Sequence, residues 1–308
     1  MPELRRRASR AGENFSVLSP LLPKDLIDDF AAVYAFCRRA DDLADSGEPT
    51  PAGRAAALEN LASLRSALDR WLSGAADADS QPVEKWHPED AMLARLAQVV
   101  RARSLRAEHF HHLLDAFERD QRQLRYETWD DLLSYCRDSA DPVGRLVLEL
   151  GGIDTADEVH ASLLRRSDAI CTALQLTNHW QGVRGDLLER DRVYLPREET
   201  GLGEEDLRAM IERPGDPELR VRYIKALRPL VEWTRQLYAE GRPIVEELVA
   251  TPARRLAPTV WLLSAGGEAT LHKIHRRGCT TLWKRPRLGL SQKMVLVLRA
   301  VAVRARIR

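Results

Sequence analysis

The feature that most constrains the fold is a succession of helical segments separated by short breaks, with almost no strand-like alternation. The spacing of apolar residues predicts long helices over residues 24–45, 158–188 and 220–249. Shorter helices are predicted over residues 54–72, 89–100, 107–126, 132–140, 142–150, 204–211 and 258–274. No Asn-Gly or Asp-Gly hairpin and no repeat of fixed period occurs. The sequence therefore predicts an all-α fold and, since no linker is visible, a single domain over residues 1–308.

The composition excludes several classes of protein. A hydrophobic content of 44% and a charged content of 30% are typical of a globular chain that buries a core. The net charge of +1 gives no argument for nucleic-acid binding. No apolar run reaches the ~18 residues of a spanning helix, and no apolar segment follows the basic start as in a signal peptide. The four cysteines show no paired CxxC spacing, so we expect reduced thiols and a cytoplasmic protein.

Two aspartates near the end of the first long helix form the first candidate site. Asp41 and Asp45 are four residues apart, so on a helix they share one face with Cβ atoms about 5–6 Å apart. Carboxylates that close repel each other unless a cation lies between them, and Mg²⁺ is the usual cation where phosphate is bound. Arg38, one turn earlier, would face an anion held by such ions. Taken alone, the pair is more often a solvated acidic helix end.

A second polar stripe lies on the helix predicted over residues 158–188. Gln175, Asn178, Gly182 and Asp186 follow one another at spacings of three or four residues, which keeps them on one face. Amide and carboxylate oxygens are suitable ligands for hard cations. Taken alone, this stripe is more often a solvent-facing surface. If the two stripes face each other inside a bundle, they would line a cavity suited to metal ions and a diphosphate.

The order of these segments resembles that of the squalene/phytoene synthases. The resemblance runs from about Asn14 to about Lys293. Its matching segments are Asn14-Phe15-Ser16, Leu22-Pro23, the run from Tyr34 to Asp45, Tyr135-Cys136, Pro142-Val143-Gly144, Gln175 to Asn178, and Arg192 to Pro196. It implies an isoprenoid synthase-type helical bundle with a central cavity, in which aspartate-rich motifs on opposing helices hold Mg²⁺. Glu13-Asn14-Phe15, the run from Tyr135 to Leu146, Trp180-Gln181 and Ala265-Gly266-Gly267 look most like the bacterial hydroxysqualene synthases of the hopanoid pathway.

The resemblance also implies roles for individual residues. The metal ligands would be Asp41, Asp45, Asn178 and Asp186, and the diphosphate would be bound by Asn14, Arg38, Gln175, Lys284, Arg285 and Lys293. Tyr135 matches a position near the diphosphate where its hydroxyl can donate, although a core tyrosine with a satisfied hydroxyl is the equal alternative. Candidates to line a cavity for the hydrocarbon tails are Phe36, Val143, Leu146 and Val147. Plain core residues would have the same sequence signature.

Three functions follow as hypotheses. The first is Mg²⁺-dependent ionisation of presqualene diphosphate with water capture, which gives hydroxysqualene and diphosphate and for which NADPH is not expected. The second is head-to-head condensation of two farnesyl diphosphates to presqualene diphosphate or squalene, with NADPH for squalene. The third is a catalytically silent fold-mate that acts as a binding or scaffold protein. Its sequence support is Gly182, which stands where the family usually has an acid. Neither Glu189 nor Asp191 lies on the right face to replace that acid if the helix is regular.

The basic C-terminal segment, residues 272–308, is a further candidate binding surface. No acid follows Glu268, whereas lysines and arginines recur to the end of the chain. Residues 294–303 are apolar apart from Arg299, which is typical of a basic amphipathic helix on an anionic membrane surface. A solvated tail is the alternative. We therefore expect a prenyl diphosphate substrate, no nucleic-acid partner, and peripheral contact with the inner face of a membrane. The sequence leaves the oligomeric state open.

Overall fold

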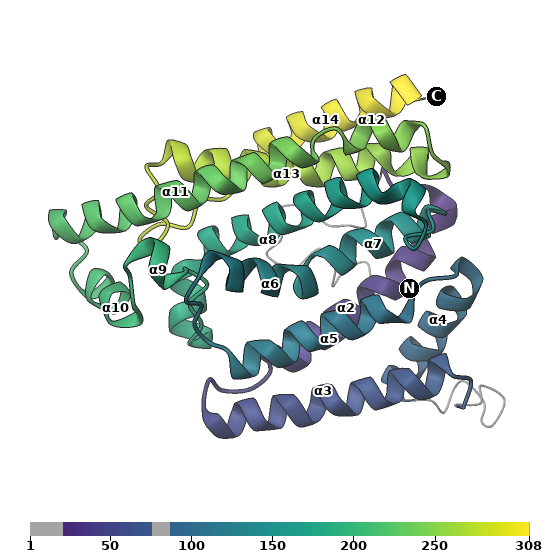
Figure 1. The fold of residues 1–308 in the computed structure, drawn as a ribbon, viewed down its shortest axis with the longest axis horizontal. Helices are drawn as coiled ribbons and strands as arrows, with labels where there is room; N and C mark the ends of the chain where they lie inside the picture. Colours follow the sequence, from purple (N-terminus) through teal and green to yellow (C-terminus); the bar gives the residue numbers. More distant parts are fainter. Residues whose placement is uncertain (1–20, 76–86, 308) are drawn as a thin grey trace.

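The computed structural model describes residues 21–75 and 87–307, and in this part of the chain the regular elements are helices (Figure 1). One isolated bridge pairs Arg125 with Val193, and no longer strand forms there. The main helices are α2 (Ile27–Asp45), α3 (Pro51–Leu72), α4 (Pro88–Arg103), α5 (Ala107–Arg122), α6 (Trp129–Ser139), α7 (Asp141–Leu150), α8 (Ala161–Arg190), α9 (Arg197–Thr200), α10 (Glu204–Glu212), α11 (Pro217–Gly241), α12 (Ile244–Val249), α13 (Ala257–Arg276) and α14 (Leu290–Ile307). Short 3₁₀ helices cover Lys24–Leu26, Glu158–His160 and Pro252–Leu256. The all-α prediction is confirmed.

The helices form layers around α8, the longest of them. Helix α3 lies along one edge, α2 and α5 lie beside it, and α6 to α8 form the middle of the molecule (Figure 1). Helices α11 to α14 form the opposite edge (Figure 1). Helix α8 packs against α6, α7, α11 and α13, so it contributes to the core on several sides. Its polar residues must therefore either find partners or line an internal space.

A large cluster of buried apolar side chains extends from Leu22, before the first helix, to Leu282, after α13. A second, smaller cluster joins α13 to α14 through Leu262, Leu296 and Ala300. These clusters cover the described residues, and the assignment of residues 1–308 to one domain stays a prediction.

Most predicted helix ends lie within three residues of the observed ones, and two helices differ more. The helix predicted over residues 220–249 is interrupted, because α11 ends at Gly241 and α12 begins at Ile244 after Pro243. Proline lacks the N–H that would continue the helical ladder. The helix predicted over residues 107–126 ends at Arg122, and the segment after it pairs with the chain beyond α8. The backbone N–H of Val193 donates to the Leu124 carbonyl at 2.8 Å, a tertiary contact that local propensity does not reveal.

Candidate active site

A cavity of about 310 Å³ lies between α2 and α8, with further walls from α5 and α6. Among the residues singled out from the sequence, its lining includes Arg38 and Asp41 of α2, Tyr135 of α6, and Gln175 and Asn178 of α8. The helical spacing explains this arrangement, since residues three or four apart project from one face of each helix. The two polar stripes thus contribute to one space, which we call the polar cavity.

Asp45 and Asp186 lie one or two helical turns beyond the residues that line the polar cavity. Both accept a hydrogen bond from the same arginine, Arg190. The Arg190 Nε donates to Asp45 Oδ2 at 3.0 Å, and its Nη1 donates to Asp186 Oδ1 at 3.4 Å. The Arg192 Nη1 also donates to Asp45 Oδ1, at 3.2 Å. One guanidinium therefore joins a carboxylate of α2 to a carboxylate of α8, and the acidic ends of both stripes are brought together.

Asp41 and Asp186 hold their protons more tightly than ordinary aspartates, because the pKa of each is raised. Burial and the neighbouring charge of Asp45 raise the pKa of Asp41 to about 6, although Arg38 acts in the opposite direction. Burial likewise raises the pKa of Asp186 to about 7, against the charges of Arg190 and Arg285. The energetic cost of ionising these groups means that an added positive charge at this position would be stabilised.

Asp120 is a residue of this site that the sequence reasoning missed. It is buried near the end of α5, where its carboxylate accepts hydrogen bonds from the Tyr135 hydroxyl at 2.9 Å and the Tyr194 hydroxyl at 2.8 Å. The Arg192 Nη1 lies 3.6 Å from the same carboxylate. The sequence did contain a signal for it. Asp120 follows Leu113 and Ala116 at helical spacing, so it is an acid on the face of the helix that is expected to be buried. Tyr135 thus lines the polar cavity, and its hydroxyl donates a hydrogen bond to Asp120.

The residues of the two stripes fit a hard divalent cation in their chemistry. They offer oxygen donors, and Arg190 supplies between Asp45 and Asp186 the positive charge that such an ion would bring. Within residues 21–75 and 87–307, no three His, Cys, Asp or Glu side chains converge closely enough to hold a metal by themselves. Mg²⁺ commonly uses one or two carboxylates and completes its shell with substrate phosphate and water. The arrangement therefore suits a cation that arrives together with a diphosphate.

Gly182 lies on the same face of α8 and carries no ligand. A Cβ built at this position would lie 2.8 Å from Asp186 Oδ2, the far end of a flexible side chain. Asp191 does not replace the missing acid, because it is held by Arg125 at 2.6 Å and by Arg54 at 3.0 Å. Glu189 is exposed on the last turn of α8.

The remaining predicted phosphate ligands differ in their position relative to the acids of the site. Arg285 lies close enough to Asp186 for its charge to lower the pKa of that carboxyl. Lys284 precedes it and is exposed, and Lys293 lies in the first turn of α14. Asn14 lies outside the described residues. The substrate roles of all these residues, and those of Arg38 and Gln175, stay predictions.

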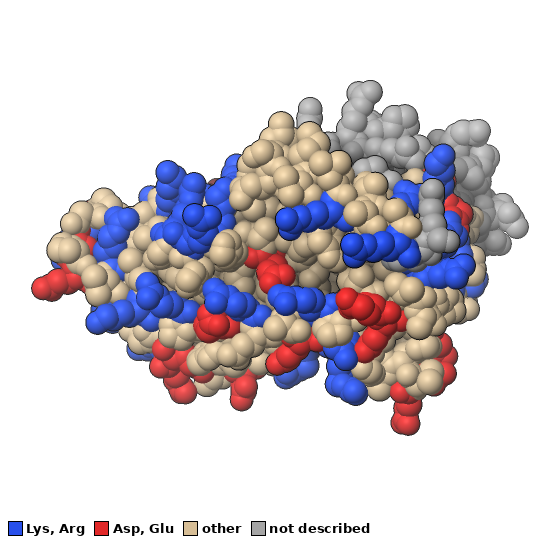
Figure 2. Space-filling view, turned by 90° about the horizontal axis from the view of Figure 1, so that it is seen from above, with Lys and Arg blue, Asp and Glu red and all other residues tan. Residues whose placement is uncertain are grey.

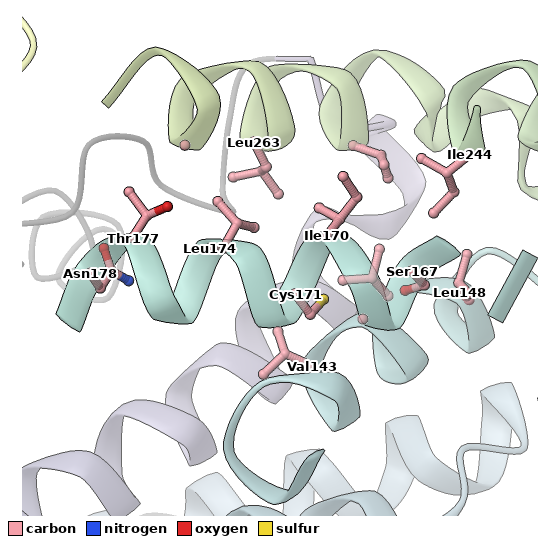
Figure 3. Close-up of a pocket in the computed structure, with 14 residues that line it drawn as sticks. Val143, Leu148, Ser167, Ile170, Cys171, Leu174, Thr177, Asn178, Ile244 and Leu263 are labelled. Atoms are coloured by element: carbon pink, nitrogen blue, oxygen red, sulfur yellow. The ribbon is translucent and has the colours of Figure 1, made fainter. Parts of the chain in front are cut away.

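A second cavity, of about 260 Å³, lies between α7, α8, α12 and α13, and we call it the apolar cavity (Figure 3). Val143 of α7, Leu174 of α8 and Leu263 of α13 are typical of its lining. Figure 3 shows Asn178 toward one end of this space and Leu148 toward the other.

Two of the four candidate tail-lining residues do line the apolar cavity, namely Val143 and Val147. Phe36 and Leu146 do not line it; both are buried in the core, and Phe36 packs edge-to-face on Phe110 with ring centroids 5.3 Å apart. Packing against neighbouring helices, rather than residue type, decides which of these apolar side chains meets the cavity.

The two cavities share Asn178, which belongs to the lining of both. One space carries charged, hydroxyl and amide groups beside Leu113, Ala116 and Phe117, and the next is lined mainly by aliphatic side chains. Such a pair of spaces is suited to a ligand with an anionic head and a long apolar tail.

Comparison with known proteins agrees with this reading. The sequence profile of the squalene/phytoene synthase family matches residues 8–293. A hydroxysqualene synthase from Rhodopseudomonas palustris is 33% identical over 253 residues, which cover 80% of this chain and 75% of that protein. One from Sinorhizobium fredii is 30% identical over 244 residues, which cover 79% of this chain and 74% of that protein.

A solved structure gives the same result for the fold. The crystal structure of squalene synthase HpnC from Alicyclobacillus acidocaldarius matches with a TM-score of 0.69 and 36% sequence identity, and the match covers 90% of this chain and 93% of that one. The isoprenoid synthase-type bundle implied by the resemblance is therefore confirmed. The matched profile, the relatives and the solved structure lead to one conclusion: the chain belongs to the squalene/phytoene synthase family and is an enzyme of that type.

Proposed function

We propose that this enzyme ionises presqualene diphosphate in a Mg²⁺-dependent step and lets water capture the rearranged cation, giving hydroxysqualene and diphosphate. The observation that carries the proposal is the shared wall at Asn178 between the polar and the apolar cavity. A prenyl diphosphate has the matching shape, with an anionic head and apolar chains. The identity to the hydroxysqualene synthase of R. palustris over most of both chains supports this particular reaction.

The chain's own residues would bind and orient the diphosphate. Arg38 forms ion pairs with Asp41 at 2.7 Å and with Asp42 at 2.6 Å. A bound phosphate oxygen would replace one of these carboxylates as a partner of the Arg38 guanidinium. Gln175 can donate from its amide, and Arg285 brings a further cation to the Asp186 side. Mg²⁺ held by Asp41, Asp45, Asn178 and Asp186 would supply Lewis-acid stabilisation of the negative charge that develops on the leaving diphosphate.

Other residues would shield the rearranged carbocation from bulk water and position the water that captures it. Val143, Leu174 and Leu263 would exclude bulk water from the hydrocarbon chains. The Tyr135 hydroxyl donates to Asp120, so its oxygen keeps lone pairs that can accept a hydrogen bond from a water in the polar cavity. The overall step balances without a redox partner, since one C–O bond breaks, water forms another, and a proton leaves with the diphosphate.

A second candidate is head-to-head condensation of two farnesyl diphosphates to presqualene diphosphate or, with NADPH, to squalene. The observation that favours it is the 36% identity to a solved structure described as a squalene synthase. Either reaction places a diphosphate in the polar cavity, so the two candidates differ in substrate and reductant rather than in the residues proposed here.

The proposal includes a cytoplasmic location with peripheral contact at the inner face of a membrane. Hydroxysqualene is apolar and would partition from water into a bilayer. No helix in the described part of the chain combines the length and the apolar character that crossing a bilayer requires.

The deciding experiment is a product assay on the purified chain. Presqualene diphosphate and farnesyl diphosphate are supplied separately, each with and without Mg²⁺ and with and without NADPH. The proposal predicts hydroxysqualene from presqualene diphosphate, dependent on Mg²⁺ and independent of NADPH. Turnover of farnesyl diphosphate alone would favour the condensation, and no product from either substrate at any Mg²⁺ concentration would leave the catalytically silent alternative.

A further inference from the structure

The outer face of α14 carries five of the nine large hydrophobic side chains that are exposed in the described chain. Its side chains are exposed although they are large and aliphatic, and Leu290 and Leu298 have 79% and 63% of their surface accessible. The outer face consists of Leu290, Met294, Val295, Leu298 and Val301. Spacings of three and four residues put these side chains on one side of the helix. Isolated exposed apolar residues are ordinary, but a continuous stripe of this kind marks an interaction surface.

Basic side chains border this outer face on both sides. At 100° per residue, Arg299 and Arg306 fall along one edge of the stripe, and Lys293 and Arg304 fall along the other. No acid occurs in the sequence after Glu268. Figure 2, which looks onto this side of the molecule, shows basic side chains spread across the middle of the surface, whereas most acidic ones lie toward its lower edge and sides, with one group near the centre.

The inner face of α14 is firmly packed, so the exposed stripe belongs to a folded element. Leu296 and Ala300 are buried against α13, where Trp261, Ala265 and Ala269 pack around them. The opposite side of α13 contributes Val260, Leu263 and Gly267 to the apolar cavity. Helix α13 therefore separates the apolar cavity from α14.

We propose that the outer face of α14 docks this enzyme onto an anionic lipid bilayer, with the helix lying in the plane of the headgroups. The aliphatic stripe would enter the boundary between headgroups and acyl chains, and the arginines and lysines at its edges would reach the anionic lipids. The charge pattern selects this occupant. A second copy of the chain would bring two basic edges together with no acid in the segment to compensate them, which is repulsive.

Docking in this orientation would hold the α13 wall of the apolar cavity beneath the membrane surface. Binding to the membrane does not depend on which reaction the enzyme catalyses. Only its purpose, the release of an apolar product into the bilayer, rests on the proposed function.

The test is co-sedimentation of the full chain with phosphatidylcholine vesicles prepared with and without phosphatidylglycerol. We expect binding to the anionic vesicles that weakens as salt is added, and much weaker binding to the neutral ones. Replacing Met294→Gln together with Leu298→Gln should reduce binding at least about tenfold, because two aliphatic side chains no longer enter the bilayer. Replacing Arg299→Gln together with Arg306→Gln should reduce it about 20- to 30-fold on the anionic vesicles.

Matched controls separate docking from general changes of surface and charge. Val159→Gln with Val221→Gln removes two exposed aliphatic side chains elsewhere, and Lys225→Gln with Arg228→Gln removes the same charge from α11. Both controls should bind vesicles nearly as the original protein does. All variants should keep the unfolding temperature, because the replaced side chains are exposed.

Several results would overturn the docking proposal. They are failure of the original protein to bind anionic vesicles, unchanged binding by the outer-face variants, and an outer-face variant that turns a dimer into a monomer without altering vesicle binding. Turnover measured in detergent micelles keeps the two proposals apart. An original protein that turns over its substrate but does not bind anionic vesicles contradicts the docking, whereas an original protein that binds vesicles without turnover contradicts the proposed function.

Discussion

The polar cavity and the apolar cavity meet at Asn178 but are built in opposite ways. In the polar cavity the charged groups are already paired, as Arg38 is with Asp41 and Asp42. The apolar cavity is lined mainly by aliphatic side chains and needs no such pairing. A ligand entering the polar end must therefore exchange ion pairs, whereas at the apolar end it mainly has to fit. Charge should decide binding of the head, and volume should decide which hydrocarbon chain is accepted.

Removing a carboxylate from the polar end should have the largest effect. We expect Asp41→Ala to lower turnover at least about a thousandfold, because it removes a carboxylate that we propose binds Mg²⁺ beside the leaving diphosphate. Inhibition by inorganic diphosphate with Mg²⁺ should weaken as well, while the helical circular dichroism stays the same. Asp28→Ala, an exposed acid on the same helix, is the control. Equal turnover by the two variants would remove Asp41 from the mechanism.

Filling the apolar end should have a smaller and different effect. Val147→Phe adds volume to the lining of the apolar cavity, and we expect kcat/KM to fall about 10- to 100-fold. Inhibition by inorganic diphosphate should remain unchanged, because the polar end is untouched. Val221→Phe, at an exposed site on α11, should leave both quantities as they are. If Val147→Phe weakens diphosphate inhibition too, the two cavities do not act separately.

Adding the acid that α8 lacks should change metal dependence. Gly182→Asp places a second carboxylate beside Asp186, and we expect the Mg²⁺ concentration for half-maximal turnover to fall about fivefold. Gly182→Ala introduces the same Cβ without charge and should not lower that concentration. A Mg²⁺ requirement that is the same in all three proteins would show that this position does not reach the metal.

The smallest expected effect concerns Asp141, a carboxyl at the start of α7 with no proposed role in binding. Burial and the charge of Asp168 raise its pKa to about 7, and it accepts a hydrogen bond from Thr172 at 3.0 Å. Since the folded state holds this proton more tightly than the unfolded state, its contribution to stability is present below about pH 4 and is lost as the pH rises through 7. We expect Asp141→Asn to stabilise the protein by about 1 kcal/mol at pH 8 and by much less at pH 4. Urea unfolding at both pH values measures this, and equal changes at the two would contradict it.

The positions of the polar stripes could be predicted from the sequence because helical spacing fixes which residues share a face. Asp41 and Asn178 do line one cavity. Their roles as ligands stay predictions. The contacts of Arg190 and Arg192 with Asp45 could not be found in the same way, since they join segments far apart in the chain. Only the folded structure shows which acids a given arginine neutralises.

Which residues line the apolar cavity was harder to predict, because the candidates are chemically alike. Val147 lines it and Leu146 is core, yet both are aliphatic neighbours on α7. No local feature separates a side chain that meets a void from one that meets another helix. The break between α11 and α12 falls at Pro243, but Pro229 lies inside α11 without ending it, so a proline alone did not locate the break.

The most direct test of the account is a crystal structure with Mn²⁺ and a farnesyl diphosphate analogue whose leaving bond is stable, with the anomalous signal locating the metal. We predict the diphosphate in the polar cavity, near Arg38, Asp41 and Asn178, and the hydrocarbon chain in the apolar cavity between α7 and α13. A diphosphate bound elsewhere, or a chain that does not enter the apolar cavity, would contradict the account.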